Sequence, residues 1–169
     1  MNLPFSPTFF RQMDIYQQLK EYESQKGEKH LWEGEKAVLI WSASDQHQHL
    51  GSAIDTHHVT NALEYAAKNG YLAQADATRL KGSVSHILES LSVHEFGTPK
   101  SIPENKLDMK INRNGILAGD ILIKTKNLKR KWQYEKWSWD WYFVYYIAGF
   151  LLFLQTLKVV SELIEKLIK

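Results

Sequence analysis

Hydrophobic residues in the N-terminal part of the chain recur three or four positions apart, a spacing that predicts a helix ending near Gly27. The members of this apolar stripe are Phe9, Phe10, Met13, Tyr16, Leu19 and Tyr22. The next apolar run, Ala37 to Trp41, fits either a buried strand or a buried helix. Leu31 and Trp32 ahead of it favour a helix, and we expect Trp32 and Trp41 to anchor the core.

Two helices with clearer apolar stripes follow. The first helix can be capped by Asp55 or Thr56 and closes at Asn69-Gly70. Its apolar residues are Val59, Ala62, Leu63, Ala66 and Ala67. The second starts near Ala75, and its stripe is Leu80, Val84, Ile87, Leu88 and Leu91. The short turn between them predicts a helix-turn-helix pair.

Beyond residue 105 the apolar residues approach alternation, which is typical of strands. Around Asn114-Gly115 the pattern predicts a β-hairpin, because this dipeptide favours the tight turn of a two-residue loop. Its first arm contains Leu107, Met109 and Ile111, and its second arm begins with Ile116 and Leu117. Gly119 within the second arm suggests a bulge.

Helices, a helix-turn-helix pair and then a hairpin form the element order of a winged-helix domain, which residues 31–125 resemble. The resemblance implies an α+β fold that is mostly helical, with the hairpin as the wing. In winged-helix DNA readers the second helix of the pair enters the major groove. The nucleic-acid contacts implied for this chain are Thr78, Arg79, Lys81 and, in the wing, Arg113.

The C-terminal part contains an uncharged run of 17 residues from Trp141 to Leu157. At about 1.5 Å per residue it spans roughly 25 Å, near the lower limit for crossing a bilayer core. Trp137, Trp139 and Trp141 crowd its start, as expected of an aromatic belt at the membrane interface. We therefore expect one transmembrane helix over residues 137–160. A buried core helix and a helix lying in the membrane interface are the alternatives.

Charge is distributed unevenly along the chain. Residues 1–123 hold 12 basic and 15 acidic side chains, whereas residues 124–136 hold 6 basic and 1 acidic. A basic strip directly before a span is retained on the cytoplasmic side, so we expect a cytoplasmic domain over residues 1–123. Lys129, Arg130 and Lys131 would meet anionic headgroups of membrane lipids. Because the domain is mildly acidic, a protein or small-ligand partner is favoured over nucleic acid.

Residues 161–169 continue as an amphipathic tail. Its apolar residues are Val160, Leu163, Ile164, Leu167 and Ile168, at helical spacing. Such a stripe needs a partner, and packing against other copies of the chain predicts a homo-oligomer. The alternatives are a helix lying on the membrane surface and the frayed end of one long helix.

Four of the seven histidines lie between Asp45 and His58. His47, His49, His57 and His58 could converge on a metal ion or another ligand, or respond to pH. The simpler interpretation places His47 and His49 in an exposed loop and His57 and His58 in the first turn of a helix. Glu33 and Glu35, in a charged stretch, are expected to be solvated.

No motif in the sequence names a reaction. GxxxxGK[ST], GxGxxG, HExxH and GxSxG are all missing, and there is no cysteine, so we expect neither an enzyme of these classes nor a cofactor. The leading hypothesis is a non-enzymatic single-pass membrane protein whose cytoplasmic domain senses or binds a partner, in outline similar to bacterial membrane-acting defence effectors. The alternatives are a membrane-tethered DNA-binding regulator and a metal-dependent enzyme that uses the histidine cluster.

Overall fold

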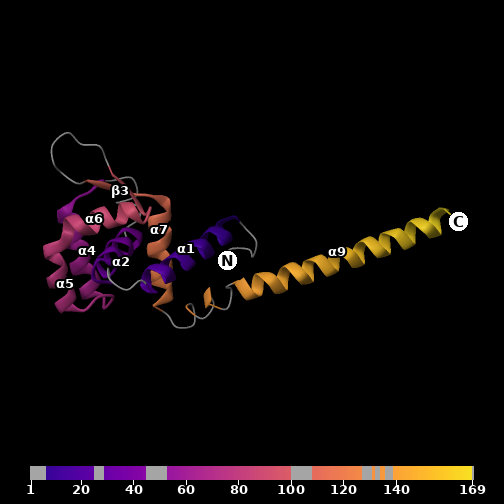
Figure 1. Cartoon of the computed structure of the whole chain (residues 1–169), viewed down its shortest axis with the longest axis horizontal. Coiled ribbons are helices and arrows are strands. Elements are labelled where there is room, and N and C mark those ends of the chain that lie inside the picture. The colour runs from indigo at the N-terminus through magenta and orange to yellow at the C-terminus, as the bar shows by residue number, and fades with distance from the viewer. Residues whose placement is uncertain are drawn as a thin grey trace. The chain divides into compact units, whose positions relative to one another are not determined.

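The structure is a computed structural model that describes residues 7–24, 29–44, 53–99, 108–126, 131, 134–135 and 139–168 (Figure 1). The chain divides into two compact units, Met1–Arg130 and Lys131–Lys169, which we describe one at a time. The described part is mostly helical and contains a three-stranded antiparallel sheet.

The first unit contains six α-helices and three short strands within the described residues. The helices are α1 (Pro7–Ser24), α2 (Lys29–Ser44), α4 (Thr56–Lys68), α5 (Gln74–Leu80), α6 (Val84–Val93) and α7 (Arg113–Thr125), and a 3₁₀ turn, Lys81–Ser83, joins α5 to α6. The strands are β1 (Ala53–Ile54), β2 (Gly97–Pro99) and β3 (Met109–Ile111).

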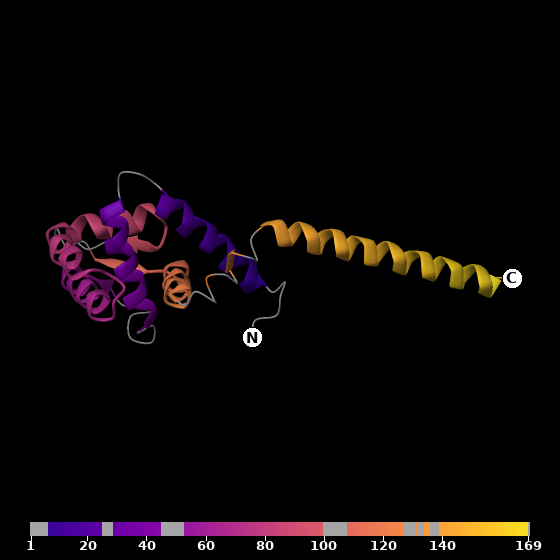
Figure 2. The same ribbon diagram turned by 90° about the horizontal axis from the view of Figure 1, so that it is seen from below.

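Helix α2 is the centre of this unit. It lies between α7 and the group α4, α5 and α6, and it contacts all four of them (Figures 1 and 2). Because neighbours surround it, the run Ala37–Ile40 is buried at every position. A helix that is covered on all sides can be apolar on all sides, which is why periodicity alone could not separate helix from strand here.

Helix α7 occupies the place where the sequence predicted a hairpin, and that prediction is wrong. The Asn112 side chain accepts a hydrogen bond from the Gly115 N–H at 2.9 Å and so caps the helix, which puts Asn114-Gly115 in its first turn. A Cβ added at Gly119 would clash with the carbonyl oxygen of Leu39 in α2. Gly119 is therefore the point of close approach between two helices, and the expected bulge is absent from this described segment.

The sheet has the strand order β1-β3-β2, and both pairings are antiparallel. Ile54 lies opposite Met109, and Thr98 lies opposite Lys110. Met109 to Ile111 is a strand, as the alternation predicted, but its partners are β1 and β2 rather than residues 116–117. An antiparallel pair of strands does follow the helices, although it lies earlier in the chain than the predicted hairpin.

The expected helix-turn-helix pair is confirmed in its first helix and differs in its second. Helix α4 is capped by Asp55 and ends at Asn69, followed by Gly70 with a φ of 69°. The second predicted helix is divided into α5 and α6 by the 3₁₀ turn at Lys81–Ser83. Gly82 lies in this turn, and a residue of low helix propensity favours an interruption there.

The second unit contains the long helix α9, Trp139–Ile168, of 30 residues. Within it the stretch Val144–Ile164 is long and apolar enough to cross a membrane, and none of it is buried. The apolar C-terminal helix predicted from the sequence is thus confirmed. Residues 161–168, predicted as an amphipathic tail, are the continuation of the same helix.

Candidate functional site

A charged side chain lies in the core of the helical domain. Glu35 of α2 has a relative exposure of 0%, so the sequence-based expectation that it is solvated is wrong. Its neighbour Gly34 lets α2 come close to α6, because a Cβ at this position would clash with the Ile87 side chain. Glu35 also falls on the apolar helical stripe that contains Trp32 and Leu39, and this spacing could have identified it.

Both carboxylate oxygens of Glu35 have partners at the end of α6, Ser90 within the helix and His94 directly after it. Ser90 Oγ donates a hydrogen bond to Oε1, and His94 Nδ1 lies 2.6 Å from Oε2. The Glu35 and His94 side chains are 1% and 12% exposed. Ser90 and His94 are four residues apart, which places them on one face of the helix end. The carboxylate is thus buried with hydrogen-bonding partners, as a buried charge requires.

Tyr22 adds helix α1 to this cluster. Its ring stacks on His94 with 4.0 Å between centroids and contacts Trp32 and Phe96 edge-on. Burial raises the pKa of the Tyr22 hydroxyl, and the negative charge of Glu35 raises it further. We call Tyr22, Trp32, Glu35, Ser90 and His94 the buried polar cluster; it connects α1, α2 and α6.

The order of groups in the buried polar cluster bears on its chemistry. The carboxylate of Glu35 lies between the Ser90 hydroxyl and the His94 imidazole. Activation of a serine as a nucleophile requires the imidazole next to the hydroxyl, with the carboxylate behind the imidazole. His94 contacts the carboxylate, so the arrangement fits a structural role better than acyl transfer.

The histidines predicted as a ligand site are only partly described. His47 and His49 lie outside the described residues, whereas His57 and His58 occupy the first turn of α4. The His58 N–H donates to Asp55 Oδ1 at 2.9 Å, and His58 Nδ1 lies 2.7 Å from the same oxygen. His57 is exposed, with Nε2 at 3.3 Å from Asn61 Nδ2. The described ranges contain no group of three or more side chains suited to hold a metal ion.

Asp55 lies at the N-terminus of α4, the helix whose first turn contains His57 and His58. The backbone hydrogen bond from His58 lowers the pKa of the Asp55 carboxyl below its ordinary value, with a further contribution from the His58 side chain. A carboxylate of the chain itself therefore already interacts with the positive end of the α4 dipole.

The residues that the winged-helix resemblance implies for nucleic acid are exposed, but most are engaged. Arg79 pairs with Asp76 at 2.8 Å, and Lys81 pairs with Glu64 at 2.6 Å. This contact with Lys81 lowers the pKa of Glu64. Thr78 Oγ1 donates to the Gln74 carbonyl, and Arg113 begins α7 rather than lying in a wing.

Of the predicted membrane-interface residues, Lys129, Arg130 and Trp137 lie outside the described residues. Lys131 is exposed, and Trp139 and Trp141 lie in the first turn of α9. The start of the basic strip belongs to the helical domain. Lys126 Nζ donates to the Asn69 carbonyl at 2.7 Å and lies 4.2 Å from the centroid of the Tyr71 ring.

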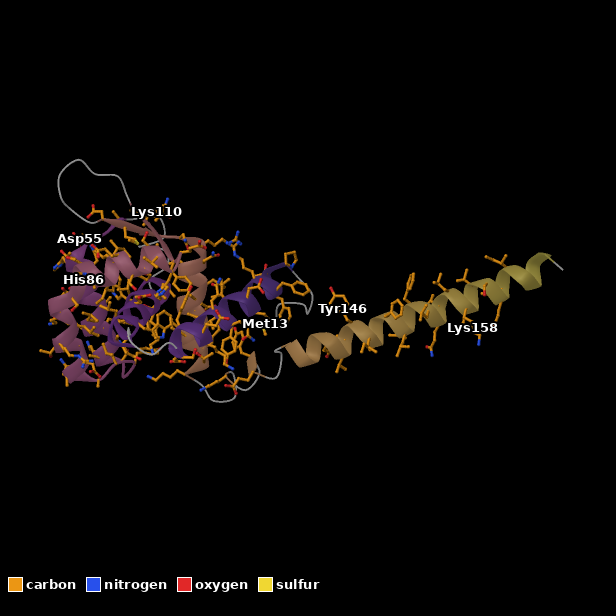
Figure 3. All side chains as sticks on the ribbon, viewed as in Figure 1. Met13, Asp55, His86, Lys110, Tyr146 and Lys158 are labelled. Atoms are coloured by element: carbon orange, nitrogen blue, oxygen red, sulfur yellow. The ribbon has the colours of Figure 1, made fainter. Side chains whose placement is uncertain are left out.

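Helix α9 differs from the other helices in that its apolar side chains are uncovered. Figure 3 shows side chains projecting from both sides of it along its length. Phe150 is 61% exposed and Leu152, about 200° around the helix, is 64% exposed.

Comparison of the chain with protein-family models, with curated proteins and with solved structures finds no match.

Proposed function

We propose that this chain is a single-pass membrane protein that α9 anchors and whose helical domain is a non-enzymatic binding module. One observation carries the proposal: the apolar side chains of Val144–Ile164 are exposed in all directions around the helix. At about 1.5 Å per residue these 21 residues extend about 31 Å, which matches a hydrocarbon core of about 30 Å. Within a membrane, lipid and neighbouring transmembrane helices cover such a helix.

The distribution of charge supports the orientation and the role that we propose for the domain. Six basic side chains in residues 124–136 favour a cytoplasmic location of the preceding domain. The pairing of Arg79 and Lys81 with carboxylates supports a protein or small ligand over duplex DNA. In this proposal the domain recognises its partner through its winged-helix-like order of helices and strands. Binding of the partner is then transmitted to the membrane through α9, in outline similar to bacterial membrane-acting defence effectors.

Alkaline carbonate extraction of membranes containing the full chain tests the anchor. We expect the wild type to remain in the pellet. The double variant Leu151→Arg/Phe153→Arg places two charges near the middle of the span, at about 3 kcal/mol each, and should be extracted. Val93→Arg is the matched control, because Val93 is 78% exposed on the helical domain, and it should stay in the pellet. Extraction of the wild type would contradict the proposal.

A further inference from the structure

The second half of α9 carries its longest polar side chains on one face. Gln155, Lys158 and Glu162 follow one another at intervals of three and four residues, and all three are exposed. At about 100° per residue they fall within about 60° of the helix circumference. The sequence continues this spacing with Glu165 and Lys169. We call Gln155, Lys158 and Glu162 the polar stripe.

The other polar side chains of this segment are satisfied by their own helix. Thr156 Oγ1 donates to the Leu152 carbonyl at 2.7 Å, and Ser161 Oγ donates to the Lys158 carbonyl at 2.8 Å. The three side chains of the polar stripe form no hydrogen bond or ion pair with any residue that the structure describes. In this structure they are therefore available to groups outside α9.

Because of its position, the polar stripe is costly to leave without partners. All three residues lie inside the candidate span Val144–Ile164. An uncompensated charge costs about 3 kcal/mol at the centre of a span and less towards its end, and ionisable residues within spans generally face the interior of a bundle. Because the three share one face, a single interface removes all of them from lipid.

We infer that the polar stripe packs against the same stripe of further copies of this chain in a parallel bundle. This inference rests on the proposed membrane-spanning function. The surface is self-complementary, because it carries a positive and a negative side chain. Lys158 and Glu162 are one turn apart, roughly 6 Å along the axis, so the lysine of one copy can reach the glutamate of its neighbour. Val160 lies on the opposite face and then contacts lipid, so the interface inferred here is the polar face rather than the apolar stripe from which self-association was predicted.

Disulfide cross-linking in membranes tests this interface, because the chain has no cysteine of its own. Leu151 precedes Gln155 by four residues and shares its face, whereas Phe153 lies about 200° around the helix from Leu151 at nearly the same depth. In the full chain, Leu151→Cys should give at least several-fold more homodimer on oxidation than Phe153→Cys. Equal yields, a stronger yield from Phe153→Cys, or adducts with another protein in place of the homodimer would overturn the inference.

Charge exchange tests the pairing within the same assay. In the Leu151→Cys background, Lys158→Glu should reduce the homodimer yield several-fold, and Lys158→Glu/Glu162→Lys should restore it. No loss in the single exchange, or no recovery in the double exchange, would contradict the pairing. Carbonate extraction of the same samples separates the two proposals: a pelleted but uncross-linked chain refutes the interface alone, whereas an extracted chain refutes the anchor.

Discussion

Ser90 of α6 and His94, the residue that follows this helix, hold Glu35, and this arrangement determines how the loss of a partner affects stability. Ser90 satisfies one carboxylate oxygen and His94 the other, while Tyr22 covers the imidazole. Removal of one partner from such a pair leaves a buried charge unpaired, whereas removal of both partners leaves only a packing change. The Glu35 carboxylate is therefore tolerated in the core only while both of its hydrogen-bonding partners are present.

His94→Ala should lower the free energy of unfolding by about 3 kcal/mol, because Glu35 loses its partner in a buried site. Glu35→Leu/His94→Leu should lose less than half as much. Urea unfolding of the full chain in detergent, followed by near-UV circular dichroism, measures both. Ser85→Ala, at an exposed position of α6, is the control and should change little. A double variant as unstable as His94→Ala would contradict this account of the cluster.

Asp55→Ala should cost about 1 kcal/mol, because α4 loses its cap. Folding lowers the pKa of Asp55, so its contribution is complete above the ordinary value of 3.8 and is lost as the pH falls through the lower folded pKa. The stability difference between wild type and Asp55→Ala should thus be full at pH 7 and shrink in strong acid. Asp55→Asn keeps an acceptor and should lose less at pH 7.

At the residue scale, the sequence predicted local contacts better than it predicted which side chains are buried. The cap at Asp55 depends on residues within one helical turn, so its position could be read directly. Burial of Glu35 depends on α6, whose partners Ser90 and His94 lie 55 and 59 residues away in the chain. Because Glu33 and Lys36 next to it are charged, the local sequence predicted that Glu35 is exposed.

At the scale of elements, α7 shows how glycines allow helices to approach closely. Gly115 and Gly119 are four residues apart and lie on one face of α7. A Cβ at Gly115 would clash with the Phe96 carbonyl oxygen, and one at Gly119 with the Leu39 carbonyl oxygen. Both obstacles are backbone atoms, which cannot move aside as a flexible side chain can. The close approach of α7 to α2 therefore depends on glycine at position 119, and its close approach to Phe96 depends on glycine at position 115.

Gly119→Ala should destabilise the domain by about 1–3 kcal/mol, since the added methyl group overpacks the interface. Gly82→Ala is the matched control. A Cβ at Gly82 would meet no atom within 4 Å, so this change should be neutral or stabilise by up to about 1 kcal/mol. Thermal unfolding of both variants in the full chain measures the difference, and equal melting temperatures would contradict the close approach.

The hairpin prediction failed because two patterns share the same residues. Asn114-Gly115 is a typical hairpin turn, and the residues before it alternate as a strand does. Gly115, Ala118 and Gly119 also form a stripe of small residues at helical spacing, and Asn112 supplies a cap. The packing of this stripe on α2 favours the helix, and such tertiary contacts are invisible to a local pattern.

At the scale of the whole molecule, the apolar helix was the most predictable feature. A span is defined by its own composition and length, so Trp141 to Leu157 could be identified without knowledge of any contact. Its continuation to Ile168 adds Lys158 and Glu162, which together with Gln155 of the uncharged run make up the polar stripe. The helical domain, in contrast, owes its arrangement to contacts between segments far apart in the chain.

We propose that α9 crosses the membrane with the helical domain in the cytoplasm. Two single-cysteine chains test it most directly, one with Val93→Cys and one with a cysteine appended after Lys169, each treated with a membrane-impermeant maleimide. The account predicts labelling of the appended cysteine in intact cells and of Val93→Cys only after lysis. Labelling of both cysteines in intact cells, or of Val93→Cys alone in intact cells, would contradict this arrangement.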